Sequence, residues 1–177
     1  MKITVFLGSS FGNDPVYAET AAQLGSWIGK NGHTLVYGGS DSGTMGVLAK
    51  ACAESNGKII GIMPQFLIDR GRAWKDLENF IVVKDMDERK ARLLAEGDAY
   101  IALPGGPGTL EEISEVISAV CLGLQKKPCI LVNTNGYYNA LNVFLQNAVK
   151  QGFMREEDNQ KIYFAKTLED VQNILEG

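Results

Sequence analysis

Short, continuously apolar segments alternate with longer stretches of helical periodicity along the whole chain. Segments without polar alternation are typical of parallel strands that are buried on both faces of a sheet. The stretches between them are mostly about 10 to 18 residues long, as expected for helices that connect successive parallel strands. We therefore predict one doubly wound α/β domain over residues 1–177, with helices on both faces of a single parallel sheet. The predicted strands lie in KITVFLG, TLVYG, KIIGIMP, FIVV, AYIALPGG, PCILVN and IYFA.

Cap and terminator residues delimit the first predicted helix. Asp14 is expected to cap this helix, Pro15 to take its first position and Gly32 to end it. After KIIGIMP the pattern becomes irregular. The segment DRGRAWKDLEN, residues 69–79, is expected to form a flexible loop that acts as a lid.

Length and charge disfavour several classes of protein. The chain has 177 residues, 45% of them hydrophobic, which suits one buried core. Its net charge of -4 argues against nucleic acid as a partner, because nucleic-acid-binding proteins normally carry a basic surface. No apolar run approaches the roughly 20 residues of a membrane-spanning helix, and the amino terminus is typical of a strand rather than a signal peptide. We expect a cytoplasmic protein that binds neither nucleic acid nor membrane.

The metal-binding residue types are few and scattered. Cys52, Cys121 and Cys129 are odd in number, form no CxxC pair and lie in apolar stretches, so we expect buried free thiols. The single histidine, His33, is expected at the start of a strand. The sequence therefore predicts no zinc site and no disulfide framework.

Three glycine-rich turns follow predicted strands: GSSFGND, GGSDSGTMG and PGGPGT. Ligands of doubly wound sheets bind outside the carboxyl ends of the strands, so these turns are expected to form one rim. At a helix N-terminus, glycines expose unpaired N–H groups to an anion, although they can also serve tight turn geometry alone. No turn has the GxGxxG or GK[ST] spacing, which disfavours NAD-binding and P-loop ATPase functions.

Thr109 and Glu112 have two interpretations. Their T-x-x-E spacing is that of a capping box, in which both side chains serve the helix N-terminus. Alternatively, one carboxylate faces a ligand in the loop. Because adjacent helical residues point about 100° apart, at most one of Glu111 and Glu112 is expected to do so.

The segment KDMDERKAR, residues 84–92, follows the fourth predicted strand and opens onto the same rim. Arg89 and Lys90 are candidates to hold a sugar hydroxyl, a phosphate or a carboxylate. The alternative is a solvated helix start in which acidic residues precede basic ones.

The segment PGGPGTLEE, residues 104–112, resembles the PGGxGTxxE motif of the LONELY GUY family of cytokinin riboside 5'-monophosphate phosphoribohydrolases, once misassigned as lysine decarboxylases. MDERKAR is similar to the second motif of that family. GSSFGNDPVYAETAAQLG, LVYGG, SGTMG and GKIIGIMP extend the likeness over most of the chain. The resemblance implies a Rossmann-like or flavodoxin-like homodimer that hydrolyses the N-glycosidic bond of a cytokinin or adenine nucleoside 5'-monophosphate. The products would be free base and ribose 5-phosphate, with no metal or organic cofactor.

By position in these motifs, the resemblance implies that Arg89 and Glu112 form the catalytic pair. The carboxylate would stabilise an oxocarbenium-like state or activate water. The arginine would orient Glu112 and the ribose, or help the base to depart. Phosphate would bind at Gly106, Gly108 and Thr109. Further substrate contacts are expected from Lys90, Gly105, Pro107, Leu110, Glu111, Ser118, Ser9, Gly39, Ser40 and Met86.

Three positions depart from the family pattern. Ser40 stands in YGGS where YGGG is common, and Asp87 in MDERK where MHxRK is frequent. Gly71 stands where a substrate-contacting glutamate often lies. These departures leave the preferred base open.

The sequence leaves one main alternative function, and aromatic residues outside the motifs bear on the oligomeric state. A nucleotide or phosphorylated-cofactor carrier on the same fold is the main alternative, and such a carrier would not require the pair Arg89 and Glu112. A lysine decarboxylase would need a Schiff-base lysine and a larger cofactor-binding scaffold, so we exclude it. Trp74, Tyr137 and Tyr138 suit either a dimer interface or the core.

Overall fold

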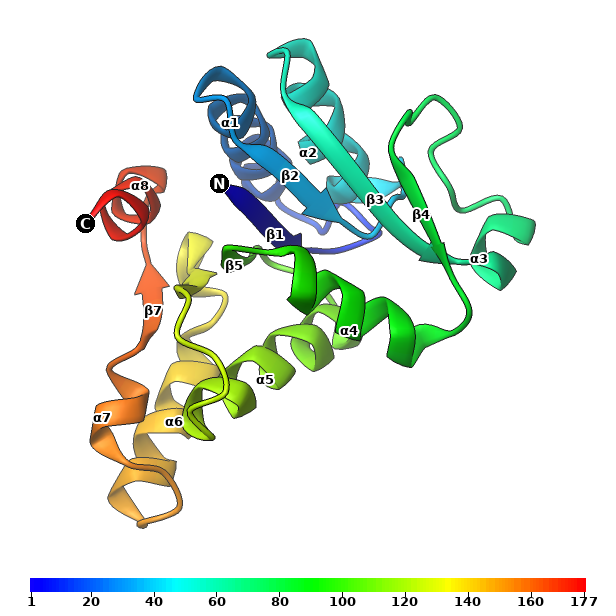
Figure 1. Cartoon of the computed structure of the whole chain (residues 1–177). Coiled ribbons are helices and arrows are strands. Elements are labelled where there is room, and N and C mark those ends of the chain that lie inside the picture. The colour runs from blue at the N-terminus through cyan, green and yellow to red at the C-terminus, as the bar shows by residue number, and fades with distance from the viewer.

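Seven strands form one sheet in the computed structural model, which describes residues 1–177 (Figure 1). The strands are β1 (Lys2–Phe6), β2 (Thr34–Tyr37), β3 (Lys58–Pro64), β4 (Phe80–Val83), β5 (Ala99–Ala102), β6 (Cys129–Val132) and β7 (Ile162–Ala165). Their order across the sheet is β4-β3-β2-β1-β5-β6-β7, and every neighbouring pair is parallel. The predicted doubly wound α/β fold is confirmed.

Helices cover both faces of the sheet (Figure 1). They are α1 (Val16–Lys30), α2 (Gly43–Glu54), α3 (Gln65–Asp69), α4 (Met86–Glu96), α5 (Pro107–Cys121), the 3₁₀ helix η1 (Thr134–Gly136), α6 (Asn139–Lys150), α7 (Glu156–Asn159) and α8 (Leu168–Glu176). One hydrophobic core joins the sheet to α1, α2 and α8, and a second joins the opposite face to α4, α5 and α6. In β1, Val5 belongs to the first core and Phe6 to the second, because successive strand residues point to opposite faces.

The first helix begins one residue later than the sequence predicts. Its first residue is Val16, whose N–H donates to the Asp14 carboxylate at 3.0 Å. Pro15 has helical dihedral angles, φ -58° and ψ -22°, but stands at the N-cap position. The chain turns away from the helix at Gly32, where φ is 68°, so the predicted terminator is confirmed.

The short helices α3, η1 and α7 were not predicted, because segments of three to five residues are too short to show a period. The segment 69–79 joins α3 to β4 and lies against the end of β2. Its Ala73 forms an isolated antiparallel bridge with Ser40, and the Trp74 N–H donates to the Gly39 carbonyl at 2.9 Å.

The three cysteines are free. Cys52 and Cys129 are buried as predicted, whereas Cys121 is half-buried because it is the last residue of α5. The prediction of a buried thiol is therefore wrong for Cys121. No helix combines the length and the hydropathy needed to cross a membrane.

The order of the strands reverses between β1 and β5. These two strands are paired in register up to Phe6 and Ala102, so both end at the same level. The loops that follow them therefore emerge next to each other. This is the place where doubly wound sheets bind ligands.

Candidate active site

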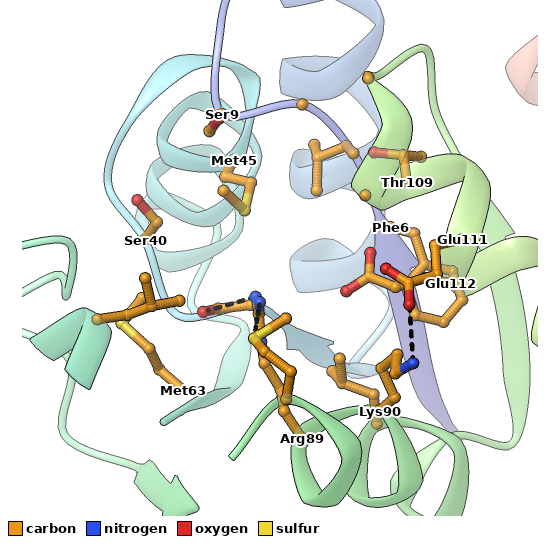
Figure 2. Close-up of a pocket in the computed structure, with 18 of the residues that line it drawn as sticks. Phe6, Ser9, Ser40, Met45, Met63, Arg89, Lys90, Thr109, Glu111 and Glu112 are labelled. Carbon is orange, nitrogen blue, oxygen red and sulfur yellow. Dashed lines mark hydrogen bonds and ion pairs between the residues drawn. The ribbon is translucent and has the colours of Figure 1, made fainter. Parts of the chain in front are cut away.

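A cavity of about 390 Å³ opens at this reversal of strand order (Figure 2). Its walls come from β1 and the loop after it, from residues following β2 and β3, and from the first turns of α4 and α5. This volume suits a small organic ligand. No group of three or more histidine, cysteine, aspartate or glutamate side chains is arranged to hold a metal ion.

The N-terminus of α5 offers free backbone donors to this cavity. Gly106 is the N-cap and Pro107 the first helical residue, so the N–H groups of Gly108 and Thr109 have no partner within the helix. Thr109 is the third helical residue and is buried, and the helix has no side-chain cap. The capping-box interpretation is therefore wrong, because the proline starts the helix earlier than Thr109. Glu112 is consequently free of any capping role.

Most of the N–H donors at the N-terminus of α2 are already paired. The Thr44 and Met45 N–H groups donate to the carbonyls of Ser10 and Gly8 at 3.5 and 3.3 Å. Gly43, with a φ of 56°, allows this approach, because a Cβ there would overlap the backbone of the loop after β1. The turn GGSDSGTMG therefore packs against the loop after β1, while its Ser40 lines the cavity.

Arg89 projects from α4 into the centre of the cavity, where the backbone holds it (Figure 2). Its Nε donates to the Ile62 carbonyl at 3.0 Å, and its Nη2 to the Gly38 carbonyl at 3.3 Å. Burial lowers the pKa of the guanidinium, while the charge of Glu112 raises it. The interpretation of a solvated helix start is therefore wrong for Arg89, which is anchored at the ends of β2 and β3.

Glu112 lies across the cavity from Arg89, and its carboxylate forms no hydrogen bond or ion pair with another protein group (Figure 2). Burial raises the pKa of Glu112 from 4.5 to about 7. The positive charge of Arg89 opposes this rise, and the charges of Glu111 and Glu115 add to it. Near neutral pH the group can therefore exchange a proton with a bound molecule or water.

Lys90, the next residue on α4, is held by carboxylates. Its Nζ lies 2.9 Å from Glu111, 3.4 Å from Glu115 and 3.8 Å from Asp87. Its side chain is only 13% exposed. Of the two adjacent glutamates on α5, Glu111 thus pairs with lysine and Glu112 faces the catalytic arginine candidate, as their angular separation predicts.

Most of the predicted site residues line one cavity, and four do not. Gly105 and Gly39 belong to the loops behind its wall, and Leu110 and Ser118 lie on the exposed face of α5. The predicted residues that line the cavity are Ser9, Ser40, Met86, Arg89, Lys90, Gly106, Pro107, Gly108, Thr109, Glu111 and Glu112.

Sequence reasoning missed the wall opposite α5. Met45, Met63 and Leu67 contribute apolar surface, and Arg70 and Arg72 contribute charge from the segment after α3. The expected lid segment was the only signal for the two arginines, which flank Gly71. The methionines carried no signal, because a methionine in an apolar stretch is most often a core residue.

The fold and the site together define a class: Rossmann-like α/β proteins in which a glycine-rich helix N-terminus lies beside a half-buried arginine and a carboxylate without a protein partner. Within this class, the chain belongs to the family described as "Possible lysine decarboxylase", which matches residues 45–175.

Relatives within the family carry a more specific name. The chain is 39% identical over 175 residues to cytokinin riboside 5'-monophosphate phosphoribohydrolase LOG7 of Arabidopsis thaliana, covering 99% of this chain and 81% of LOG7. It is also 39% identical over 169 residues to cytokinin riboside 5'-monophosphate phosphoribohydrolase of Rhodococcoides fascians, covering 95% and 85% of the two chains. The resemblance noted in the sequence is confirmed.

Solved structures share the fold at lower identity. The molybdenum cofactor binding protein of Rippkaea orientalis superposes with a TM-score of 0.76 at 23% identity, over 99% of this chain and 94% of the other. The molybdenum cofactor carrier protein of Chlamydomonas reinhardtii gives 0.73 at 20% identity, over 99% and 98%. At such identities the likeness supports the fold alone.

Proposed function

We propose that this protein hydrolyses the N-glycosidic bond of a cytokinin or adenine nucleoside 5'-monophosphate, releasing the base and ribose 5-phosphate. The observation that carries the proposal is the free, half-buried carboxylate of Glu112 between a helix N-terminus with unpaired donors and the anchored guanidinium of Arg89. The names of the LOG relatives support it.

The 5'-phosphate binds at the N-terminus of α5 in this proposal. The N–H groups of Gly106, Gly108 and Thr109 and the positive end of the helix dipole favour an anion there. Pro107 lacks an N–H, and its ring fixes the dihedral angle φ of the first turn. Phosphate binding thus places the ribose over the next turn of the helix, which carries Glu112.

Glu112 supplies the charge that the reaction needs. Breaking the bond between ribose and base develops positive charge on the sugar, and a nearby carboxylate stabilises it or activates the attacking water. Both roles require the ionised form, and a carboxylate already tied to lysine would serve them less well. Glu111, paired with Lys90, is therefore excluded as the acting group.

Arg89 acts from the opposite side of the bond. Two of its nitrogens are held by carbonyls of Ile62 and Gly38, and Nη1 has only the Met86 sulfur at 3.9 Å. Nη1 therefore keeps donors for a ribose hydroxyl or for the departing base. The apolar side chains of Met45, Met63 and Leu67 offer a wall to a planar base.

The site does not suit lysine decarboxylation. Lys90 is the only lysine that lines the cavity, and its ammonium is ion-paired with two glutamates, which disfavours the neutral amine that a Schiff base needs. A homodimer and a cytoplasmic location complete the proposal. Leu110, which is 47% exposed, and Ser118 lie on the outer face of α5, where a second copy would cover them.

Incubation of the protein with AMP, other nucleoside 5'-monophosphates and cytokinin riboside 5'-monophosphates, with chromatography of the products, tests the proposal. Free base and ribose 5-phosphate are expected from wild type. Glu112→Gln is expected to bind nucleotide but not to turn it over, because the shape survives while the charge is lost. Glu54→Gln is the control, since Glu54 is an exposed glutamate at the end of α2 and lies outside the cavity lining. Saturable binding with intact nucleotide throughout would favour a carrier.

A further inference from the structure

Two consecutive tyrosines bind the loop between β5 and α5 on the side away from the cavity. The Tyr138 hydroxyl donates to the Leu103 carbonyl at 2.7 Å, and the Tyr137 hydroxyl to the Gly105 carbonyl at 2.5 Å. Neither tyrosine lines the cavity. They follow η1, far from this loop in sequence, so the contact joins two separate strand-to-helix connections.

The direction of the Gly105 carbonyl fixes the direction of a donor in the site. In a planar trans peptide, the C=O of one residue and the N–H of the next point in opposite directions. The carbonyl of Gly105 and the N–H of Gly106 share one peptide, and Gly106 lines the cavity whereas Gly105 does not. By holding the carbonyl outside, the Tyr137 hydroxyl keeps this N–H available to the cavity and keeps a repulsive carbonyl away from a bound anion.

The two tyrosines form a rigid support. Tyr138 is only 5% exposed, and burial raises the pKa of its hydroxyl, which therefore stays protonated as a donor. The rings of Tyr137 and Tyr138 pack edge to face at 5.1 Å, and Tyr17 of α1 packs against Tyr137 at 5.8 Å. Tyr17 follows the loop after β1, so the aromatic cluster links both loops at the cavity.

The connection that carries the tyrosines is itself anchored by side-chain amides. The Tyr138 N–H donates to Asn133 Oδ1 at 2.7 Å, and Asn135 Nδ2 donates to Asp14 Oδ2 at 3.0 Å. Asn135 adopts a φ of 51°, which brings the chain round to the tyrosines. The hydroxyls are thus presented from a fixed backbone.

We propose that Tyr137 and Tyr138 are positioning residues for the phosphate subsite, acting through the peptide between Gly105 and Gly106. The inference rests on the proposed function only in naming phosphate as the anion. Tyr138 fixes the start of the loop at Leu103, and Tyr137 fixes the peptide that presents the donor.

The variant Tyr137→Phe tests the proposal with little risk to folding, because Tyr137 is 45% exposed and the ring is retained. KM for AMP is expected to rise about fivefold to tenfold, with kcat within about twofold. The dissociation constants of ribose 5-phosphate and inorganic phosphate, measured by calorimetry, are expected to rise in parallel. Binding of the free base is expected to stay unchanged.

Tyr100→Phe is the matched control. Its hydroxyl also donates to a backbone carbonyl, that of Leu94 at 2.6 Å, but the residue does not line the cavity or touch its loops. It is expected to lower thermal stability without changing KM. An unchanged dissociation constant of ribose 5-phosphate in Tyr137→Phe, or an equal loss of phosphate and base binding, would overturn the positioning role. If wild type binds AMP without hydrolysing it and Tyr137→Phe weakens that binding, the proposed hydrolysis fails while the positioning role stands.

Discussion

Replacing Gly38 with alanine is expected to slow the reaction by displacing Arg89. A Cβ at this position would overlap Nη2 of Arg89, and its next contact is the Met45 sulfur at 3.3 Å. Gly38 is not among the glycines with positive φ, so alanine is compatible with the backbone. The steric conflict therefore falls on a flexible side chain, and the variant is expected to fold.

The magnitude follows from the two anchors of the guanidinium. The bond to the Gly38 carbonyl is lost, whereas the shorter bond from Nε to Ile62 survives. A hydrogen bond to a charged group contributes about 1.5 to 3 kcal/mol, and the length of 3.3 Å favours the lower end of this range. If the displaced guanidinium stabilises the transition state less by the lower value of this range, kcat/KM falls about tenfold. Binding of inorganic phosphate, which the proposed function places at the N-terminus of α5, is expected to be unaffected.

A double-mutant cycle with Arg89→Ala provides the assay. Initial rates of base release are compared for wild type, Gly38→Ala, Arg89→Ala and the double variant, with thermal melting as the folding control. If Gly38 acts through Arg89, the alanine has no further effect once the guanidinium is gone. A further tenfold loss in the double variant would refute the reasoning.

Two other predictions concern ionisation of Glu112. Because the ionised form is the active one and its pKa is about 7, kcat/KM is expected to rise with pH through about 7. Removal of Arg89, whose charge holds this pKa down, should move the rise to higher pH, and a pH-independent rate would contradict the assignment. The folded-state pKa also lies above the ordinary value of 4.5, so wild type loses stability as pH rises from 4.5 to about 7. Glu112→Gln escapes this loss, and urea denaturation should find it more stable than wild type at about pH 8, by at most about 3 kcal/mol, with little difference at about pH 5.

The strands and long helices were predictable because each carries its own pattern of apolar residues. No local sequence pattern indicates the reversal of strand order, and therefore none indicates that Arg89 and Glu112 line the same cavity. Here the general rule for doubly wound sheets and the motif resemblance supplied what periodicity does not. The N-cap of α5 is Gly106 and not Thr109, which shows the limit of cap rules, since two valid start signals lie within three residues of each other.

The features that the sequence did not predict depend on contacts between segments that are distant in the chain. The carbonyls of Gly8 and Ser10 accept hydrogen bonds from N–H groups at the N-terminus of α2. This contact forms only because two loops approach each other closely. The placement of Arg70 and Arg72 depends on the path of the segment after α3, which a backbone bridge to Ser40 directs. The hydrogen bond from the Tyr137 hydroxyl depends on the register of the strands and on the conformation of two loops. From the sequence alone, Tyr137 could therefore be assigned only to an interface or to the core.

Arg89 is anchored by carbonyl groups of β3 and of the residue after β2, whereas Glu112 lies on α5, on the other side of the strand reversal. The cavity therefore has two sides that come from different parts of the sheet. In the proposed function, the part built on β5 and α5 binds the phosphate and the sugar, which every nucleoside 5'-monophosphate has. Residues from the end of β3 to the segment after α3 line the other side of the cavity, and we expect Met63, Leu67, Arg70 and Arg72 to face the base there. Exchange of residues 63–73 is therefore expected to change which base is accepted while Arg89 and Glu112 are retained.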